Sequence, residues 1–392
     1  MLIFAASLAI FVYGIVASML GTISAGLAQR YHFDNVQTGY MAFAQGVGLV
    51  VASVSVGPLL DRRGKKVGLL LGLGLVAASL YAMANAETLG MMVACMLVLG
   101  FGGGITITAA NALGSDISET KRASVLNFLN VFVGLGGFAT PFVAGNLLDG
   151  DPVRVAYTAA VLTTGAFLVH AFLKMPAPSS QQQSGSEGAA GLFNQPLLYL
   201  LAFTIFLYTA CEFGIWNWLV KYLITRGIPQ SNALNILSLG FALGLLLGRV
   251  LIMPILIKVS ALAATASAAL LMALTTFAVL HVSTPASAGV LVFCTGLAMA
   301  PVFPTTISIV GGLFRQRTST AIGFTITCGF SGLMVSSPLI GWLSGSDPQG
   351  LGKALLLLPI ASLIIVAVDL AIYRKVQEGF VANLNSPVLE NN

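Results

Sequence analysis

Twelve apolar stretches follow one another along almost the whole chain, and each is about as long as a helix that crosses a bilayer. They cover residues 2–28, 37–60, 67–85, 88–113, 123–148, 154–174, 196–220, 231–257, 261–281, 287–313, 320–344 and 353–373. The stretches lack the alternating pattern of a membrane barrel. The sequence therefore predicts an all-α membrane protein with twelve transmembrane helices.

The composition agrees with this class, because 57% of the 392 residues are hydrophobic and only 8% are charged. In soluble domains, about a quarter of the residues are charged. The first apolar stretch has no cleavage site of small residues, so we expect it to be retained as a span. Four cysteines lie inside spans without metal-type spacing and are expected to be free. They are Cys95, Cys211, Cys294 and Cys328.

Lys and Arg are divided unequally between the two sets of loops. With both termini in the cytoplasm, the inner side carries Arg62, Arg63, Lys65, Lys66, Lys121, Arg122, Lys174, Lys258, Arg315, Arg317, Arg374 and Lys375. The outer side then carries Arg30, Arg154, Lys221, Arg226 and Lys353. The positive-inside rule favours this orientation, and the net charge of +5 indicates topology instead of nucleic-acid binding. The short loops favour a bacterial inner membrane.

A polar, low-complexity segment, PAPSSQQQSGSEGAAG at 176–191, separates the sixth and seventh spans and predicts a flexible linker. A shift of about 196 residues aligns Gly100 with Gly296 and Pro58 with Pro254. The sequence thus predicts an N-terminal six-helix bundle at 1–174, a cytoplasmic linker at 175–195, a C-terminal six-helix bundle at 196–375 and a cytoplasmic tail at 376–392. Transporters built from such repeats hold their substrate between the halves.

The loop after the second span reads GPLLDRRGKK, residues 57–66. It resembles the G-x-x-x-D-R-x-G-[RK]-[RK] signature of the major facilitator superfamily. The resemblance implies two pseudo-symmetric six-helix bundles and a conformational latch. The latch residues are Gly57, Asp61, Arg62, Gly64 and Lys65.

The chemistry of this loop suits a latch. Asp61 can face the positive N-terminal end of a neighbouring helix, and Gly64 permits a tight turn. The resemblance implies that this neighbour is the eleventh helix, which we expect to begin near Thr318. The second half carries only MPILIK at 253–258, where Ile257 replaces the aspartate. We therefore expect the latch on one side only.

Three further stretches resemble the fucose, galactose and glucose permease family: LNFLNVFVGLGG at 126–137, GLAMAPVFPT at 296–305 and YTACEFGIWNWLVKYL at 208–223. This resemblance implies a sugar:cation symporter that works by alternating access. Two features depart from that family. Asn130 replaces a His or Gln, and the first and fourth spans contain no Asp or Glu, whereas proton-coupled fucose permeases have acids there. The proton route of that family therefore does not transfer directly.

Glu212 and Arg249 are the ionisable residues well inside the spans, and Asp369 lies near the inner end of the twelfth. A carboxylate at this depth costs about 3 kcal/mol, and Glu212 shares a helix face with Tyr208 and Trp216, four residues away on either side. We expect Glu212 to couple transport to an ion, by carrying a proton or binding sodium. The alternative is a glutamate that only hydrogen-bonds to a neighbouring helix.

The helical rise separates Arg249 from Glu212 by about 10 Å along the membrane normal, so we expect no direct ion pair. Helix carbonyls, Asp369 or the inner interface are the alternative partners of Arg249. Asp369 can also bond to Arg374. The Pro301-x-x-Pro304 pair predicts a bend or break in the tenth helix.

Sugar sites combine aromatic faces with amide and hydroxyl groups. The candidate solute-binding residues are Asn127, Asn130, Trp216, Asn217, Asn111, Gln45 and Tyr208. Packing between helices is the open alternative for each asparagine.

The sequence favours a secondary active transporter that imports a small neutral hydrophilic solute, first a monosaccharide, by H⁺ or Na⁺ symport. The alternative is a proton-coupled exporter of drugs or other lipophilic compounds, although TPFVAG at 140–145 matches the exporter pattern G-P-x-x-G-G poorly. Without a catalytic cluster or a phosphate-binding loop, we expect no enzyme. We expect no cofactor beyond the coupling ion and no metal site. We expect a monomeric protein of the cell inner membrane whose partners are a solute and the lipid bilayer. We expect no binding to nucleic acid.

Overall fold

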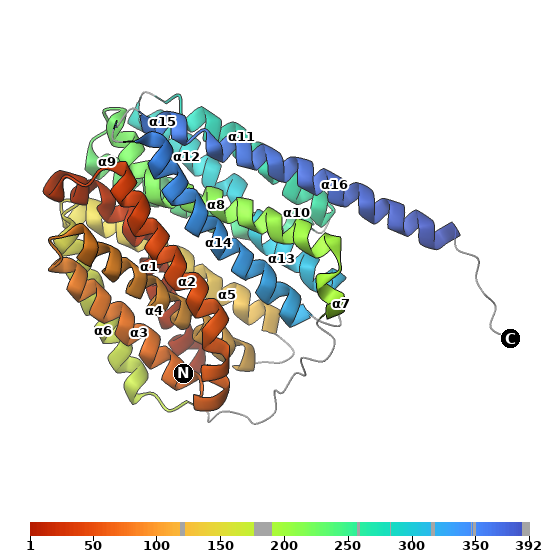
Figure 1. The fold of residues 1–392 in the computed structure, drawn as a ribbon, viewed down its shortest axis with the longest axis horizontal. Helices are drawn as coiled ribbons and strands as arrows, with labels where there is room; N and C mark the ends of the chain where they lie inside the picture. The colour runs from red at the N-terminus through yellow and green to blue at the C-terminus, as the bar shows by residue number, and fades with distance from the viewer. Residues whose placement is uncertain are drawn as a thin grey trace.

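A computed structural model of the chain describes residues 1–117, 122–175, 190–256, 259–282, 284–314, 318–345, 347 and 350–385. Within these residues it is built from helices, without strands (Figure 1). Twelve helical segments are long and apolar enough to cross a membrane, at positions that agree with the predicted spans. The predicted fold class is confirmed.

The first half contains α1 (Leu2–Tyr31), α2 (Asn35–Arg63), α3 (Lys65–Ala84), α4 (Leu89–Ile117), α5 (Arg122–Leu147) and α6 (Pro152–Phe172). Local signals set several of these ends. Asp34 and Gln37 form a capping box at the start of α2, with hydrogen bonds of 2.8 and 3.0 Å. Asp151 caps α6, where Pro152 occupies the first turn.

The second half contains α7 (Ala190–Phe193), α8 (Pro196–Thr225), α9 (Gln230–Asn235), the π-helix η1 (Ile236–Ala242), α10 (Leu243–Leu256), α11 (Ala261–Val279), α12 (Pro285–Met299), α13 (Val302–Leu313), α14 (Thr318–Ser344), α15 (Gly350–Ala354) and α16 (Leu357–Asn385). The tenth span is broken between α12 and α13 at Pro301, as predicted, because proline lacks a backbone donor. The eighth span contains the unpredicted η1. The last helix continues to Asn385, beyond its predicted end at 373.

The two halves repeat the same helix pairings. α1 packs on α5 as α8 packs on α14, and α3 packs on α6 as α11 packs on α16. Figure 1 shows α1 to α6 on one side of the molecule and α8 to α16 on the other. This repetition is the arrangement expected of two related six-helix bundles.

Among the described residues, the main contacts between the bundles join α1 with α8, α2 with α14, and α5 with α9, η1 and α10. Among the glycines that the structure describes, Gly21 marks the tightest contact between the bundles, because a Cβ atom there would overlap the carbonyl group of Trp216 where α1 meets α8. Only glycine allows the two backbones to lie this close.

The α2 and α14 helices meet at one end and separate at the other. A Cβ atom on Gly46 would lie 2.7 Å from the Cα atom of Met334. Gly57 lies eleven residues after Gly46 and Gly323 lies eleven before Met334, about three turns in each helix, so both glycines continue the same faces. Yet neither Gly57 nor Gly323 would meet any atom within 4 Å. The helices therefore diverge toward the end at which α2 terminates.

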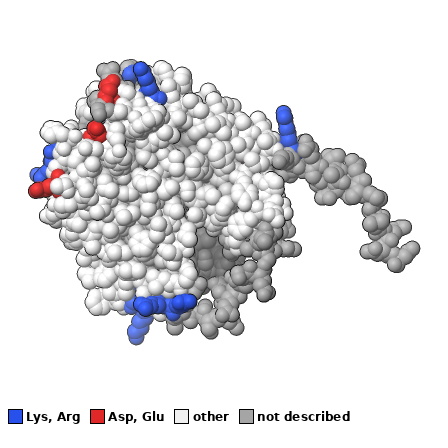
Figure 2. Space-filling model, viewed as in Figure 1, with Lys and Arg blue, Asp and Glu red and all other residues white. Residues whose placement is uncertain are grey.

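Charged side chains gather at the two ends of the molecule. Figure 2 shows Lys and Arg at the edge where α2 ends, acidic residues together with Lys or Arg toward the opposite end and a largely uncharged surface between them. This uncharged surface is consistent with a hydrocarbon layer. Following the predicted orientation, we name the end where α2 terminates the inner end and the opposite end the outer end.

Candidate functional site

Glu212 lies half-buried on α8, the helix of the second bundle that packs on α1. Its carboxylate interacts electrostatically with Arg249 of α10 and contacts the side chains of Tyr208 and Trp216. The same carboxylate acts on Tyr13 of α1, which belongs to the other bundle. Glu212 is thus the central charge of a site shared by both bundles.

Tyr208 lies between the two charged groups. Its side chain is fully buried and interacts with both Glu212 and Arg249, although its hydroxyl makes no hydrogen bond of good geometry. Its ring centroid lies 6.1 Å from that of Phe303 on α13. Tyr208 is therefore a neighbour of both the carboxylate and the guanidinium.

The structure agrees with one part of the prediction for Arg249 and differs from another. No ion pair within 4.0 Å joins Arg249 to Glu212 among the described residues, in agreement with the expectation. However, the guanidinium interacts with Glu212 and Tyr208, and no contact with Asp369 is found in that part of the chain. The helical rise gives the height of the Arg249 backbone along the membrane normal. The long Arg249 side chain extends from there and brings the guanidinium closer to Glu212.

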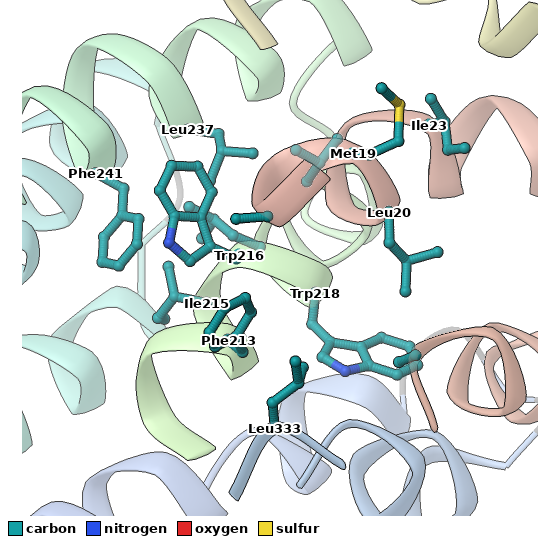
Figure 3. Close-up of a cluster of buried hydrophobic side chains, with 14 of the residues drawn as sticks. Met19, Leu20, Ile23, Phe213, Ile215, Trp216, Trp218, Leu237, Phe241 and Leu333 are labelled. Atoms are coloured by element: carbon teal, nitrogen blue, oxygen red, sulfur yellow. The ribbon is translucent and has the colours of Figure 1, made fainter. Parts of the chain in front are cut away.

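Aromatic side chains form the outer boundary of the site. Trp216 is 5% exposed, and its ring meets Phe241 of η1 edge to face with centroids 5.1 Å apart. Figure 3 shows Trp216 beside Phe241 and Leu237, whereas Trp218 points in another direction, toward Leu333. Single π-turns inside helices often occur at functional sites.

Two predicted solute-binding amides instead connect helices. Gln45 of α2 is buried and donates from Nε2 to the Val16 carbonyl of α1 at 2.9 Å. Asn217 of α8 is buried and donates from Nδ2 to the Ser337 hydroxyl of α14 at 2.9 Å. This geometry is that of the packing alternative, so both amides are engaged within the protein.

Asn130 is exposed, and its Nδ2 donates to the Leu126 carbonyl of its own helix at 3.0 Å. Gly134 and Gly137, four and seven residues further along the same face of α5, lie against Leu246 and Trp216. The face of α5 that carries Asn130 is therefore directed toward the second bundle.

The structure gives less information on two other residues that were predicted to bind the solute. The side chain of Asn127 lies outside the described residues. Asn111 is half-buried on α4, and its carbonyl accepts a hydrogen bond from the Ser115 hydroxyl at 2.9 Å. The solute-binding roles of both remain predictions.

Asp369 lies apart from the Glu212 site. It is buried on α16, where its Oδ1 accepts a hydrogen bond of 3.4 Å from the Thr204 hydroxyl of α8. The expected bond to Arg374 is not found among the described residues, and the Arg374 side chain is exposed.

The predicted latch loop forms a tight turn after α2. Gly64 has a φ of 86° and donates its N–H to the Leu60 carbonyl at 2.9 Å, so the turn requires glycine. Arg62 is exposed, and α14 begins at Thr318 as expected, whereas the Asp61 side chain lies outside the described residues. Lys66 Nζ donates to two carbonyls at the end of α6, both at 2.8 Å. The latch roles, including that of Lys65, remain predictions.

Polar contacts close the outer end between the bundles. Lys221 is 8% exposed, and its Nζ donates to the Thr38 hydroxyl at 2.8 Å and the Asn35 side chain at 3.2 Å, both on α2. Asn146 of α5 and Asn235 of α9 exchange hydrogen bonds of 2.6 and 3.2 Å. Lys221 thus lies in the contact between the bundles. The charge pattern had counted it among the outer loops.

The comparison with known families decides the class. Residues 6–337 match the family model of the Major Facilitator Superfamily. The chain belongs to the Major Facilitator Superfamily. Its fold is also that of two crystal structures of the nucleoside transporter NupG, with TM-scores of 0.80 and 0.75, each 15% identical in sequence. These matches cover 95% of this chain and 100% and 99% of the NupG chains, and they show the fold alone.

Curated relatives match over shorter lengths. The 4-hydroxybenzoate transporter PcaK of Pseudomonas aeruginosa is 27% identical over 36% of this chain and 32% of its own. The human vesicular acetylcholine transporter is 28% identical over 40% of this chain and 31% of its own. The class D tetracycline resistance protein of Salmonella ordonez is 27% identical over 41% of this chain and 43% of its own. The chain thus spans less than half the length of each, and these superfamily relatives have different named substrates.

Proposed function

We propose that this transporter imports a small neutral hydrophilic solute, with a monosaccharide as the first candidate, by proton symport through Glu212. The observation that carries the proposal is the half-buried Glu212 carboxylate, which meets Arg249 and Tyr208 of its own bundle and Tyr13 of the other. A carboxylate kept at this depth implies a function that offsets its cost.

The surroundings of Glu212 favour a proton over sodium as the coupling ion. Cations such as sodium prefer a shell of several oxygen ligands. Glu212 instead has a guanidinium nearby, which attracts the carboxylate and would repel a second cation. A proton needs only the carboxylate itself.

The pair of Glu212 and Arg249 supplies a coupling mechanism. While Glu212 is ionised, its charge attracts the guanidinium of Arg249. Protonation removes that attraction and frees the donors of Arg249 for the hydroxyl groups of a solute. Proton binding and solute binding then favour each other, as symport requires.

The contacts between the bundles support an inward-facing state. The outer end is closed by Lys221 and by the Gly21 contact, whereas Gly57 and Gly323 have no neighbours at the inner end. Alternating access would exchange these conditions, so that the outer contacts break and Gly57 approaches Gly323.

The composition of the site favours a sugar. Arg249 and the exposed Asn130 offer polar groups, and the rings of Trp216 and Tyr208, which are buried in this state, would offer aromatic surfaces once uncovered. A nucleoside is the second candidate, because it combines sugar hydroxyls with a flat ring that could stack on such aromatic groups. NupG, which has this fold, is described as a nucleoside transporter.

Uptake into proteoliposomes tests this proposal. A panel of labelled monosaccharides and nucleosides is offered under an imposed proton gradient, a sodium gradient or no gradient, with efflux of lipophilic dyes measured in parallel. We expect one monosaccharide to accumulate when the outside is acidic, and no response to sodium. Uptake at the same rate with and without the proton gradient, or outward movement of dyes alone, would contradict the proposal.

A further inference from the structure

Asp369 is a buried carboxyl group that the Glu212 site does not use. Only 2% of the residue is exposed. Thr204 of α8 donates to its Oδ1 at 3.4 Å, and Thr265 of α11 contacts the carboxyl group as well. Its second oxygen, Oδ2, has no hydrogen-bond partner among the described residues. A buried carboxylate with one unpaired oxygen is costly unless its charge is removed or balanced.

The helices that pack on Asp369 supply no positive charge to balance it. α11 contains no Asp, Glu, Lys, Arg or His between Ala261 and Val279. On α8, the next titratable side chains after Thr204 are Tyr208, Cys211 and Glu212. The Cys211 thiol lies 3.8 Å from the Ser362 hydroxyl, two turns from Asp369 along α16. Within the described part of the chain, no cation pairs with the carboxyl group.

Hydroxyl groups surround the Asp369 carboxyl group on two sides. The Thr265 hydroxyl contacts the carboxyl group and also lies 3.0 Å from the Leu262 carbonyl, so its one hydrogen is shared between two acceptors. Neither threonine supplies a partner for Oδ2. A proton on Oδ2 would remove the buried charge, while Oδ1 continues to accept from Thr204.

We propose that Asp369 is a second proton-binding site, which holds its proton on Oδ2 and exchanges it with the inner side during transport. This inference rests on the proposed proton symport. Thr204 lies eight residues before Glu212 on α8, about 12 Å toward the inner end, and Asp369 lies five residues before the exposed Arg374. Asp369 is thus placed between the coupling carboxylate and the inner surface.

The position of Thr204 links this second site to the first. Thr204, Tyr208 and Glu212 follow one another along α8 at intervals of four residues. A tilt of α8 between the two states of the transporter would change the surroundings of Glu212 and move the Thr204 donor relative to Asp369. The hold of Asp369 on its proton would then change once in each cycle.

The substitution Asp369→Asn tests the inference, because an amide preserves the hydrogen bonds of the protonated acid without binding a proton. In proteoliposomes, we expect exchange of solute at equal pH to continue, whereas accumulation driven by a proton gradient is lost. Accumulation at the wild-type level would overturn the inference. Loss of exchange in a folded variant would also overturn it, because the carboxyl group would then be needed for solute movement itself.

A second variant tests the proton on Oδ2 directly. Thr265→Val removes a hydroxyl that favours the ionised carboxyl group, so Asp369 should bind its proton more tightly and the pH profile of accumulation should shift toward more alkaline pH. Thr276→Val is the matched control, because Thr276 is buried on the same helix and bonds only to carbonyls of that helix. An unshifted profile in Thr265→Val, or a requirement for sodium that disappears in Asp369→Asn, would overturn the inference.

Glu212→Gln separates the two proposals. If proton symport itself is wrong, Glu212→Gln leaves proton-driven accumulation unchanged. If only the second site is wrong, Glu212→Gln abolishes accumulation and Asp369→Asn does not.

Discussion

The backbone of Gly21 in α1 lies directly against the carbonyl group of Trp216 in α8, without room for a Cβ atom between them. Trp216 lies one turn from Glu212 and contacts its carboxylate. This tight contact between the bundles is therefore next to the coupling residue. A change in the contact between α1 and α8 must also change the surroundings of Glu212.

Gly21→Ala should open the outer end, because the added methyl group would overlap the Trp216 carbonyl. The test uses a single cysteine, introduced by Leu234→Cys in a background without the native cysteines. We expect this cysteine to react faster with a membrane-impermeant thiol reagent when Gly21→Ala is present. Leu234 is fully buried at the outer contact with α5. Gly165→Ala is the control, since a Cβ atom there meets nothing within 4 Å, and equal labelling in both variants would contradict this prediction.

Gly57→Val should have the opposite effect on the cycle. The side chain has space in this structure, so we expect the inward-facing state to form normally. Closure of the inner end against Gly323 would be blocked, and net uptake should fall while the labelling of Leu234→Cys stays low. Gly90→Val, at another uncrowded glycine, is the control. Wild-type uptake by Gly57→Val would show that α2 and α14 do not close there.

Lys221→Met should weaken the closed outer end, because it removes both hydrogen bonds to α2. Hydrogen bonds from charged groups contribute about 1.5–3 kcal/mol, so we expect the labelling rate of Leu234→Cys to rise by about tenfold or more. Thr38→Val should add little in the Lys221→Met background. Fully additive effects of the two substitutions would mean that the Lys221–Thr38 bond does not stabilise the closure.

Hydropathy was sufficient to predict the fold, because the bilayer requires each crossing segment to be long, apolar and internally hydrogen-bonded. The break at Pro301 also followed from local chemistry. The π-turn at 236–242 did not, since its sequence, ILSLGFA, is ordinary apolar helix. Its geometry depends on packing against neighbouring helices, which local sequence does not specify.

The candidate site was predicted only in part. The spacing of Tyr208, Glu212 and Trp216 placed them on one face, and the structure brings their side chains together. Tyr13 was missed, although the internal repeat contains the signal: FVYG at 11–14 aligns with FLYT at 206–209 and pairs Tyr13 with Tyr208. Gln45 was assigned to the solute because a buried amide that joins two helices has the same sequence signature as one that faces a cavity.

Arg249→Met should impair transport by leaving the Glu212 carboxylate without its positive neighbour. We expect the double variant with Glu212→Gln to recover solute exchange, because the unbalanced charge is gone, but not proton-driven accumulation. Exchange and accumulation are measured in the same proteoliposomes. If exchange is as poor in the double variant as in Arg249→Met, the two side chains do not act as a pair.

Proton movement driven by the solute tests the role of Glu212 most directly. Addition of the transported solute to lightly buffered proteoliposomes should make the outside more alkaline with the wild-type protein. With Glu212→Gln it should produce no pH change, while labelled solute still exchanges across the membrane, and Glu212→Asp should retain part of the signal. A wild-type pH change with Glu212→Gln would contradict proton coupling through this carboxylate.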